Sequence, residues 1–113
     1  MPNFVTKLIG DKKEWKAMEA RAKVLPPDYR AVYETIKPYM WKQTTDDGTD
    51  TIRALDTILT DFEAAAGRHA PVRDVTGADV AAFCDLRLRA AVAAYADRWR
   101  AHLNADVTRE LAD

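Results

Sequence analysis

The feature that most constrains this chain is a helical spacing of apolar residues that persists from one end to the other. In successive segments the apolar side chains recur every three or four residues, which places them on one face of an α-helix. Glycine and proline most strongly interrupt a helix, and the 113 residues contain only four and five of them. Most of these lie between the periodic segments. The sequence therefore predicts an all-α fold in which residues 1–113 form a single domain.

Capping and helix-breaking residues divide this pattern into a short N-terminal helix that ends near Gly10 and four main helices. We expect the main helices at residues 11–25, 28–43, 50–66 and 77–111. Pro38 lies inside the second one, where it removes a backbone hydrogen bond, so a kink or a break is expected there. Thr76 is predicted to cap the last helix, after a connecting loop at residues 68–75.

The apolar faces of these helices are expected to pack as an up-and-down bundle with a long C-terminal helix. No helix breaker follows Ala78, so that helix can reach about 30 residues, or ~45 Å. This exceeds the length of its expected neighbours, so its last turns are predicted to project, to fray or to pack on a second subunit. Trp99 is placed in the core, where its replacement by alanine is expected to cost about 3–5 kcal/mol.

Composition and charge argue against several classes of protein. The formal net charge is -1, and the lysines near the N-terminus are diluted by Glu14 and Glu19, which argues against direct binding to nucleic acid. No apolar stretch approaches the ~18 residues of a membrane-spanning helix, and the N-terminal segment lacks the apolar core of a signal peptide. Cys84 is the only cysteine, so no disulfide forms within the chain. We therefore expect a cytoplasmic protein with no membrane partner.

The sequence shows no set of residues typical of a catalytic, cofactor-binding or metal site, and we expect no cofactor and no enzymatic activity. The two histidines, His69 and His102, lack the ligand spacing that zinc requires, although His102 and Asp106 stand one helical turn apart. Cys84 follows Phe83 on an apolar face, which favours a packing role over a nucleophilic one. The chain also contains no serine and no glycine-rich phosphate loop.

Large aromatic residues are numerous for a chain of this size. Two interpretations are open: a core with aromatic residues at its boundary, or a concave or flat aromatic surface that binds a hydrophobic ligand or a protein partner. Trp41 is of particular interest because it follows the internal proline and precedes a polar loop. The candidate ligand or partner surface consists of Trp15, Tyr29, Tyr33, Tyr39, Trp41, Tyr95, Trp99 and His102.

Two pairs of sequence motifs carry a resemblance to a known family. The first pair is GDKKEW with LPPDYR, and the second is VTGADVAAFCD with YADRWR. Together with the loop DDGT and the helix LDTILTDFEAAAGR, they resemble DUF1048, a bacterial family of small helical proteins of unknown function. The resemblance implies an all-helical bundle and carries over no activity and no catalytic residues. Genes of the family commonly lie near those of PadR-type transcriptional regulators, so the resemblance also implies an accessory regulatory role.

Two functions are compatible with these features. The first is a non-enzymatic interaction module, which binds a protein partner or forms a homodimer through the long C-terminal helix and exposed aromatic residues. The second is a binding protein for a small hydrophobic or aromatic ligand, with a pocket between helices. The excess length of the last helix favours the first, and an enzyme has the weakest support because no acid–base or nucleophilic set is visible.

Overall fold

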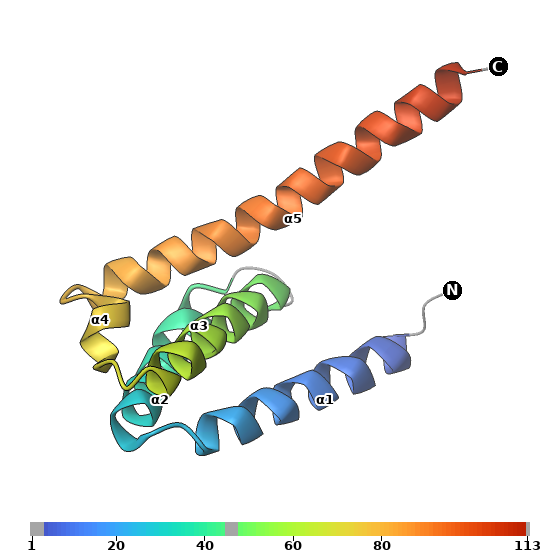
Figure 1. Cartoon of the computed structure of the whole chain (residues 1–113). Coiled ribbons are helices and arrows are strands. Elements are labelled where there is room, and N and C mark those ends of the chain that lie inside the picture. The colour runs from blue at the N-terminus through green and yellow to red at the C-terminus, as the bar shows by residue number, and fades with distance from the viewer. Residues whose placement is uncertain (1–3, 45–47, 113) are drawn as a thin grey trace.

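The computed structural model describes residues 4–44 and 48–112, with side chains described from Lys12 onward. The described residues form five α-helices and no strand, so the prediction of an all-α fold is confirmed (Figure 1). In chain order the helices are α1 (Phe4–Lys23), α2 (Pro27–Lys42), α3 (Thr49–Gly67), α4 (Val72–Thr76) and α5 (Val80–Leu111).

The first helix is one uninterrupted element, and the prediction of a short N-terminal helix separate from a helix at 11–25 is wrong. α1 passes through Gly10 and Asp11 and ends at Lys23, before Pro26. A single glycine costs a helix only about 1 kcal/mol relative to alanine, which does not end it without a second breaking residue. The fifth helix of the fold therefore lies elsewhere in the chain.

That fifth helix is α4, which occupies the segment predicted to be a loop. Pro71 precedes α4, and Gly77 ends it with a left-handed φ of 71°. Because Gly77 interrupts the helical backbone, α5 begins later than predicted, and its cap is Asp79 instead of Thr76. The backbone N–H of Ala82 donates a hydrogen bond of 2.9 Å to Oδ1 of Asp79, as in other helix N-caps.

Pro38 does not break its helix, because α2 continues to Lys42. Its side chain is exposed. Water can therefore satisfy the carbonyl of Glu34, which the proline ring leaves without its helical partner. The expected break is absent for this reason.

The buried core lies mainly between α2 and α3. Tyr33 and Met40 of α2 are completely buried, as are most apolar residues of α3. The core residues of these two helices are Tyr29, Tyr33, Ile36, Met40, Ala54, Leu55, Ile58, Leu59, Phe62 and Ala65. α5 contributes only Phe83 and Cys84, both from its first two turns, to the buried core. The core therefore uses one end of the longest helix.

The rest of α5 extends beyond the other helices, so the described chain spans 59 × 30 × 27 Å (Figure 1). Residues 97–112 are all exposed. Of the three outcomes expected for the last turns, projection is the one that the single chain shows, and the placement of Trp99 in the core is wrong because this side chain is 59% exposed. The helices that α5 packs against end before its C-terminal half, so nothing within the described chain covers that half.

Candidate functional site

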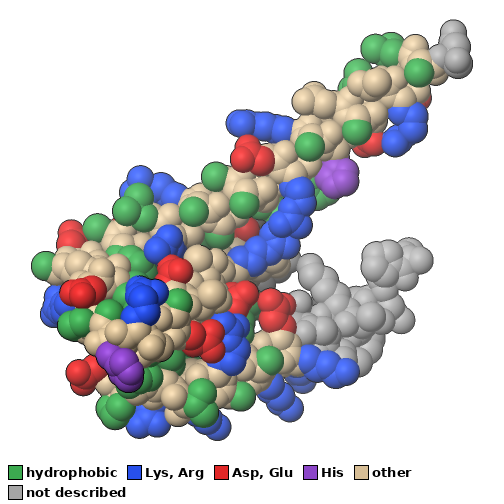
Figure 2. All heavy atoms as spheres, viewed as in Figure 1, with side chains coloured by type: hydrophobic (Ala, Val, Ile, Leu, Met, Phe, Trp, Pro, Cys, Tyr) green, Lys and Arg blue, Asp and Glu red, His purple; other side chains and the backbone are tan. Residues whose placement is uncertain are grey.

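Exposed apolar side chains form a row along the projecting part of α5. They recur at steps of three and four residues, so successive members lie next to each other while the row winds gradually around the helix. Their exposed fractions range from 40% to 80%. We call this set the α5 stripe: Val92, Tyr95, Trp99, Leu103, Val107 and Leu111. Figure 2 shows hydrophobic side chains in green along the projecting arm, between charged groups of both signs.

Aromatic and cation–π contacts hold the first large side chains of the α5 stripe, Tyr95 and Trp99, in place. The ring of Tyr95 lies edge-on to Trp99 at a centroid distance of 5.8 Å, and Trp99 lies 6.2 Å from the ring of His102. On the side of the body, the guanidinium of Arg53 on α3 lies 5.7 Å from the centre of the Tyr95 ring. Cation–π contacts of this kind are favourable. Tyr95 therefore joins the stripe to the body, and Trp99 is the first large ring beyond it.

The tryptophans near the N-terminal half form a second, separate cluster. Trp15 of α1 and Trp41 of α2 meet edge to face at 5.7 Å, and the ammonium of Lys37 lies 5.7 Å from the Trp15 ring. Gly48 packs against Trp41, because a Cβ on this glycine would lie 2.8 Å from Cζ3 of the indole. Trp41 is 36% exposed. This cluster connects α1 to α2 and contacts Gly48 beyond the end of α2.

Two of the predicted surface residues lie in the core. Tyr29 is 4% exposed, and its hydroxyl donates a hydrogen bond of 2.5 Å to the carbonyl of Ala70. Tyr33 is completely buried. Burial raises the pKa of both phenols. The eight predicted residues therefore do not form one surface: Tyr95, Trp99 and His102 lie together on α5, Trp15 and Trp41 form the second cluster, and Tyr29 and Tyr33 belong to the core.

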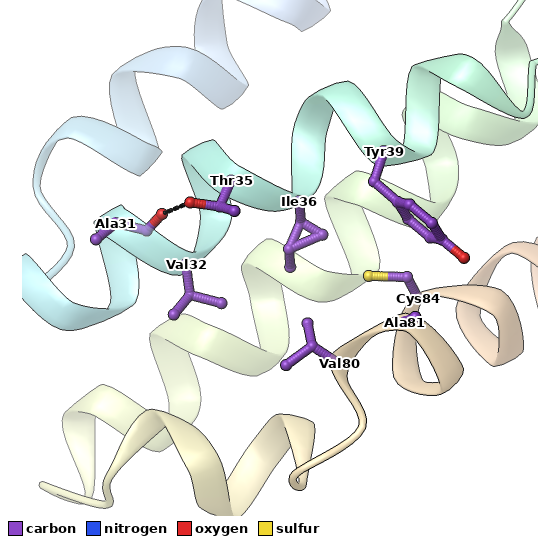
Figure 3. Close-up of a pocket in the computed structure, with 8 residues that line it drawn as sticks. All are labelled: Ala31, Val32, Thr35, Ile36, Tyr39, Val80, Ala81 and Cys84. Carbon is purple, nitrogen blue, oxygen red and sulfur yellow. Dashed lines mark hydrogen bonds between the residues drawn. The ribbon is translucent and has the colours of Figure 1, made fainter.

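Tyr39, the eighth residue, borders a groove between α2 and α5. Its hydroxyl donates a hydrogen bond of 2.8 Å to Oδ1 of Asp85, and this bond raises the pKa of Tyr39. On one side of it lies a pocket of about 350 Å³ that is open to solvent and is called the cavity below; it is lined by Ala31, Val32, Thr35, Ile36, Tyr39, Val80, Ala81 and Cys84 (Figure 3). On the other side lies an open hollow of about 640 Å³, lined by Gln43, Asp85, Leu88, Arg89, Val92 and Ala93. We call the two together the α2–α5 groove.

The groove and the α5 stripe meet on the same helix at one residue. Val92 belongs to both, since it lines the open hollow and is 47% exposed. The cavity is almost wholly apolar, and the hydroxyl of Thr35 at its edge already donates to the carbonyl of Ala31 (2.8 Å). Val92 therefore links the groove to the exposed apolar row on the projecting part of α5.

The thiol of Cys84 faces this cavity (Figure 3) and is 1% exposed. Burial, with a smaller contribution from the charge of Asp85, raises the pKa of Cys84 to about 11. The thiolate is the nucleophilic form of cysteine, so this side chain is protonated and poorly reactive near neutral pH. Its environment favours packing over covalent chemistry.

Residues 4–44 and 48–112 contain no group of three or more His, Cys, Asp or Glu side chains arranged to hold a metal ion. His102 and Asp106 stand one turn apart on α5 but do not face a common ligand position. The carboxylate of Asp106 pairs with Arg109, while His102 lies against Trp99. The described helices also include none with the length and apolar character needed to cross a membrane.

Sequence reasoning missed the apolar members of both surfaces. Leu103, Val107 and Leu111 continue the helical spacing of the core, so the pattern alone does not distinguish them from buried residues. The feature of the sequence that could have identified them as exposed is the length of α5, because this helix extends beyond the ends of the helices it packs against. The sequence pattern did not indicate the groove, because Ile36 and Val80 have the helical spacing of ordinary core residues.

Comparison with known proteins gives the family. A crystal structure of a DUF1048 protein from Bacillus cereus ATCC 10987, described as a left-handed superhelix fold, matches with a TM-score of 0.62 and 37% sequence identity. The match covers 67% of this chain and 94% of that chain. No curated protein matches this sequence. The model of the DUF1048 family, described as proteins of unknown function, matches residues 6–108. This chain therefore belongs to the DUF1048 family.

Proposed function

We propose that this protein is a non-enzymatic interaction module that binds another protein chain through the α5 stripe. The supporting observation is the row of six apolar side chains, each at least 40% exposed, on a helix that leaves the body. Contiguous exposed apolar surface on a soluble domain is typical of interaction sites. Trp99 and Tyr95 add the large aromatic rings that contribute most to the binding energy of protein interfaces.

The family resemblance suggests a PadR-type transcriptional regulator as the partner. The test is a titration of the purified protein with a PadR-type regulator from the same organism. Replacing Trp99 and Leu103 together by alanine should weaken binding by about 2 kcal/mol or more, a factor of about 30, because both side chains lose buried apolar area. Leu86→Ala is the control, since Leu86 is 61% exposed on α5 but points about 100° or more away from Trp99 and Leu103 around the helix.

Equal affinities for the wild type, the double variant and Leu86→Ala would contradict a role of the stripe in this interaction. Circular dichroism of the double variant should remain helical, because neither side chain is buried. Reduced binding can then be assigned to the surface rather than to unfolding.

The cavity beside Cys84 supports a second candidate function, the binding of a small apolar ligand. Its volume of about 350 Å³ and its apolar lining are within the range of small-molecule sites. Among the side chains that the structure describes, Tyr39 is the only aromatic one that lines it, so the predicted aromatic surface does not form this cavity. Small aromatic and aliphatic compounds should raise the melting temperature of the wild type and not that of Ala81→Trp, which fills the cavity. Ala94→Trp, on an exposed part of α5, is the control, and equal shifts in all three proteins would exclude this site.

A further inference from the structure

The carboxylate of Asp85 lies where the cavity meets the open hollow of the α2–α5 groove. Asp85 lines the hollow and directly follows Cys84, which lines the cavity. Its Oδ1 accepts the hydrogen bond of 2.8 Å from the hydroxyl of Tyr39, whose ring lines the cavity and extends from α2 toward α5 (Figure 3). The charge of Asp85 also contributes to the raised pKa of the Cys84 thiol. An acidic group therefore borders an almost wholly apolar space.

Asp85 differs from the carboxylates that lie between the other helices. Asp85 is half-buried, and no ion pair joins it to any lysine, arginine or histidine whose side chain the structure describes. The other carboxylates have basic partners: Asp56 and Glu63 pair with Arg21, Glu19 with Lys37, and Asp61 with Arg87. Arg89, one helical turn beyond Asp85, lines the hollow but is exposed and does not pair with it. Within the described chain, the negative charge at the rim of the cavity therefore meets only a neutral phenol.

The polar groups around the cavity offer acceptors rather than donors to a ligand. The hydroxyl of Thr35 already donates to the carbonyl of Ala31, and that of Tyr39 donates to Asp85. The remaining lone pairs of the Asp85 carboxylate can only accept. An ammonium group supplies three donors and no acceptor, and its hydrogen bonds to a carboxylate are stronger than those between neutral groups. The rim of the cavity therefore favours a cationic donor.

From these contacts we infer that the cavity binds a small lipophilic amine, with its rings among the apolar side chains and its ammonium group against Asp85. A cavity of roughly 150 Å³ holds one benzene ring, so the volume of about 350 Å³ accommodates a group of two rings. A half-buried carboxylate attracts a cation more strongly than one in open water, because the effective dielectric constant is lower. This inference rests on the second candidate function and names the chemical class of its ligand.

The first test is calorimetric titration of the wild type with three compounds of similar shape and different charge: naphthylmethylamine, naphthylmethanol and naphthoate. At neutral pH the amine is a cation, the alcohol is neutral and the carboxylate is an anion. The amine should bind about tenfold more tightly than the alcohol, or better, and naphthoate should bind most weakly. Added salt should weaken binding of the amine and leave that of the alcohol unchanged, because salt screens only the charged contact.

The second test identifies the group that selects the cation. Asp85→Asn removes the charge and keeps an oxygen that accepts from Tyr39, so the amine and the alcohol should then bind equally, with the affinity of the alcohol unchanged. Asp97→Asn is the matched control, because it removes the same charge from an exposed site about three helical turns further along α5. Ala81→Trp, which fills the cavity, should bind none of the three compounds. The salt dependence of the wild type tests the same charge without any substitution.

The other outcomes separate this inference from the second candidate function. Equal affinities of the wild type for the amine and the alcohol would overturn the cationic class and leave the cavity as a site for neutral apolar compounds. A preference for the amine that persists in Asp85→Asn would overturn Asp85 as its partner. Tightest binding of naphthoate would overturn the inference in favour of an anion held by Arg89. Binding of none of the three compounds would remove the support for both the inference and the second candidate function.

Discussion

Phe62 lies at the centre of the core, with the ring of Tyr29 edge-on at 5.3 Å and that of Phe83 stacked at 6.4 Å. Trp99 is larger than Phe62, but its neighbours within the described chain are only Tyr95 and His102 on its own helix. The contribution of an aromatic residue to stability therefore depends on which elements meet around it. Both residues have the same helical spacing in the sequence, which is why Trp99 was assigned to the core.

These surroundings predict opposite results for two substitutions. Phe62→Ala should lower the free energy of unfolding by about 3–5 kcal/mol, because it leaves a cavity in a close-packed core. Trp99→Ala should lower it by less than about 1 kcal/mol, because the side chain is 59% exposed. Urea denaturation at a concentration low enough to suppress association measures both. A loss of several kcal/mol for Trp99→Ala would restore its assignment to the core.

The phenols of Tyr29 and Tyr33 predict how stability changes at alkaline pH. Burial raises both pKa values in the folded protein above the value of about 10 in the unfolded chain. The native state then holds these protons more tightly, so stability is full below about pH 10 and falls as the pH rises through the folded pKa values. Urea denaturation between pH 8 and 11 should show this loss, and Tyr33→Phe should reduce its slope. An unchanged slope in Tyr33→Phe would show that Tyr33 ionises freely in the folded state.

At the scale of elements, α1 is attached to the body largely by ion pairs. Arg21 contacts Asp56 at 2.6 Å and Glu63 at 2.5 Å, both on α3, and donates a hydrogen bond of 3.0 Å to Thr60. Lys37 of α2 contacts Glu19 of α1 at 2.9 Å. Among the described side chains, the buried contribution of α1 is limited to Met18 and Ala22. The ion pairs therefore add to the apolar contacts of Met18, Ala22 and Trp15 in attaching α1 to the body.

This attachment should depend on salt. Arg21→Met is expected to lower the free energy of unfolding by about 1 kcal/mol at low ionic strength and by less in high salt, because these pairs are partly exposed and screened. Arg100→Met is the control, since its contact with Asp97 is 3.6 Å long and highly exposed. Urea denaturation of both variants at two salt concentrations tests this. An equal loss for the two would contradict a special role of Arg21.

The sequence predicted the elements better than their ends. The helical spacing identified α2, α3 and α5 to within three residues, because amphipathic faces and capping residues are local signals. It failed at Gly10, where one glycine suggested a helix end that packing did not require, and at Val72–Thr76, where a single helical turn is too short to show a period. The α2–α5 groove depends on how two helices cross, which no local pattern encodes.

At the scale of the whole molecule, the described chain has two parts with different roles. The helices α2 to α4 and the first turns of α5 form the core, and the remainder of α5 carries apolar surface that the core does not use. A chain truncated after Ala96 should therefore have a free energy of unfolding, measured in urea, within about 0.5 kcal/mol of that of the intact protein. It should also fail to associate. A large loss of stability on truncation would show that the projecting half folds back on the body.

Amide hydrogen exchange across residues 95–111 is the most direct test of the claim that the α5 stripe is a protein interface. A helix end without neighbours exchanges rapidly, and association should slow this exchange. We predict that protection of these residues increases with protein concentration or on addition of the regulator, while the core residues of α3 remain equally protected throughout. Exchange in 95–111 that stays fast at every concentration and with the regulator present would contradict the account.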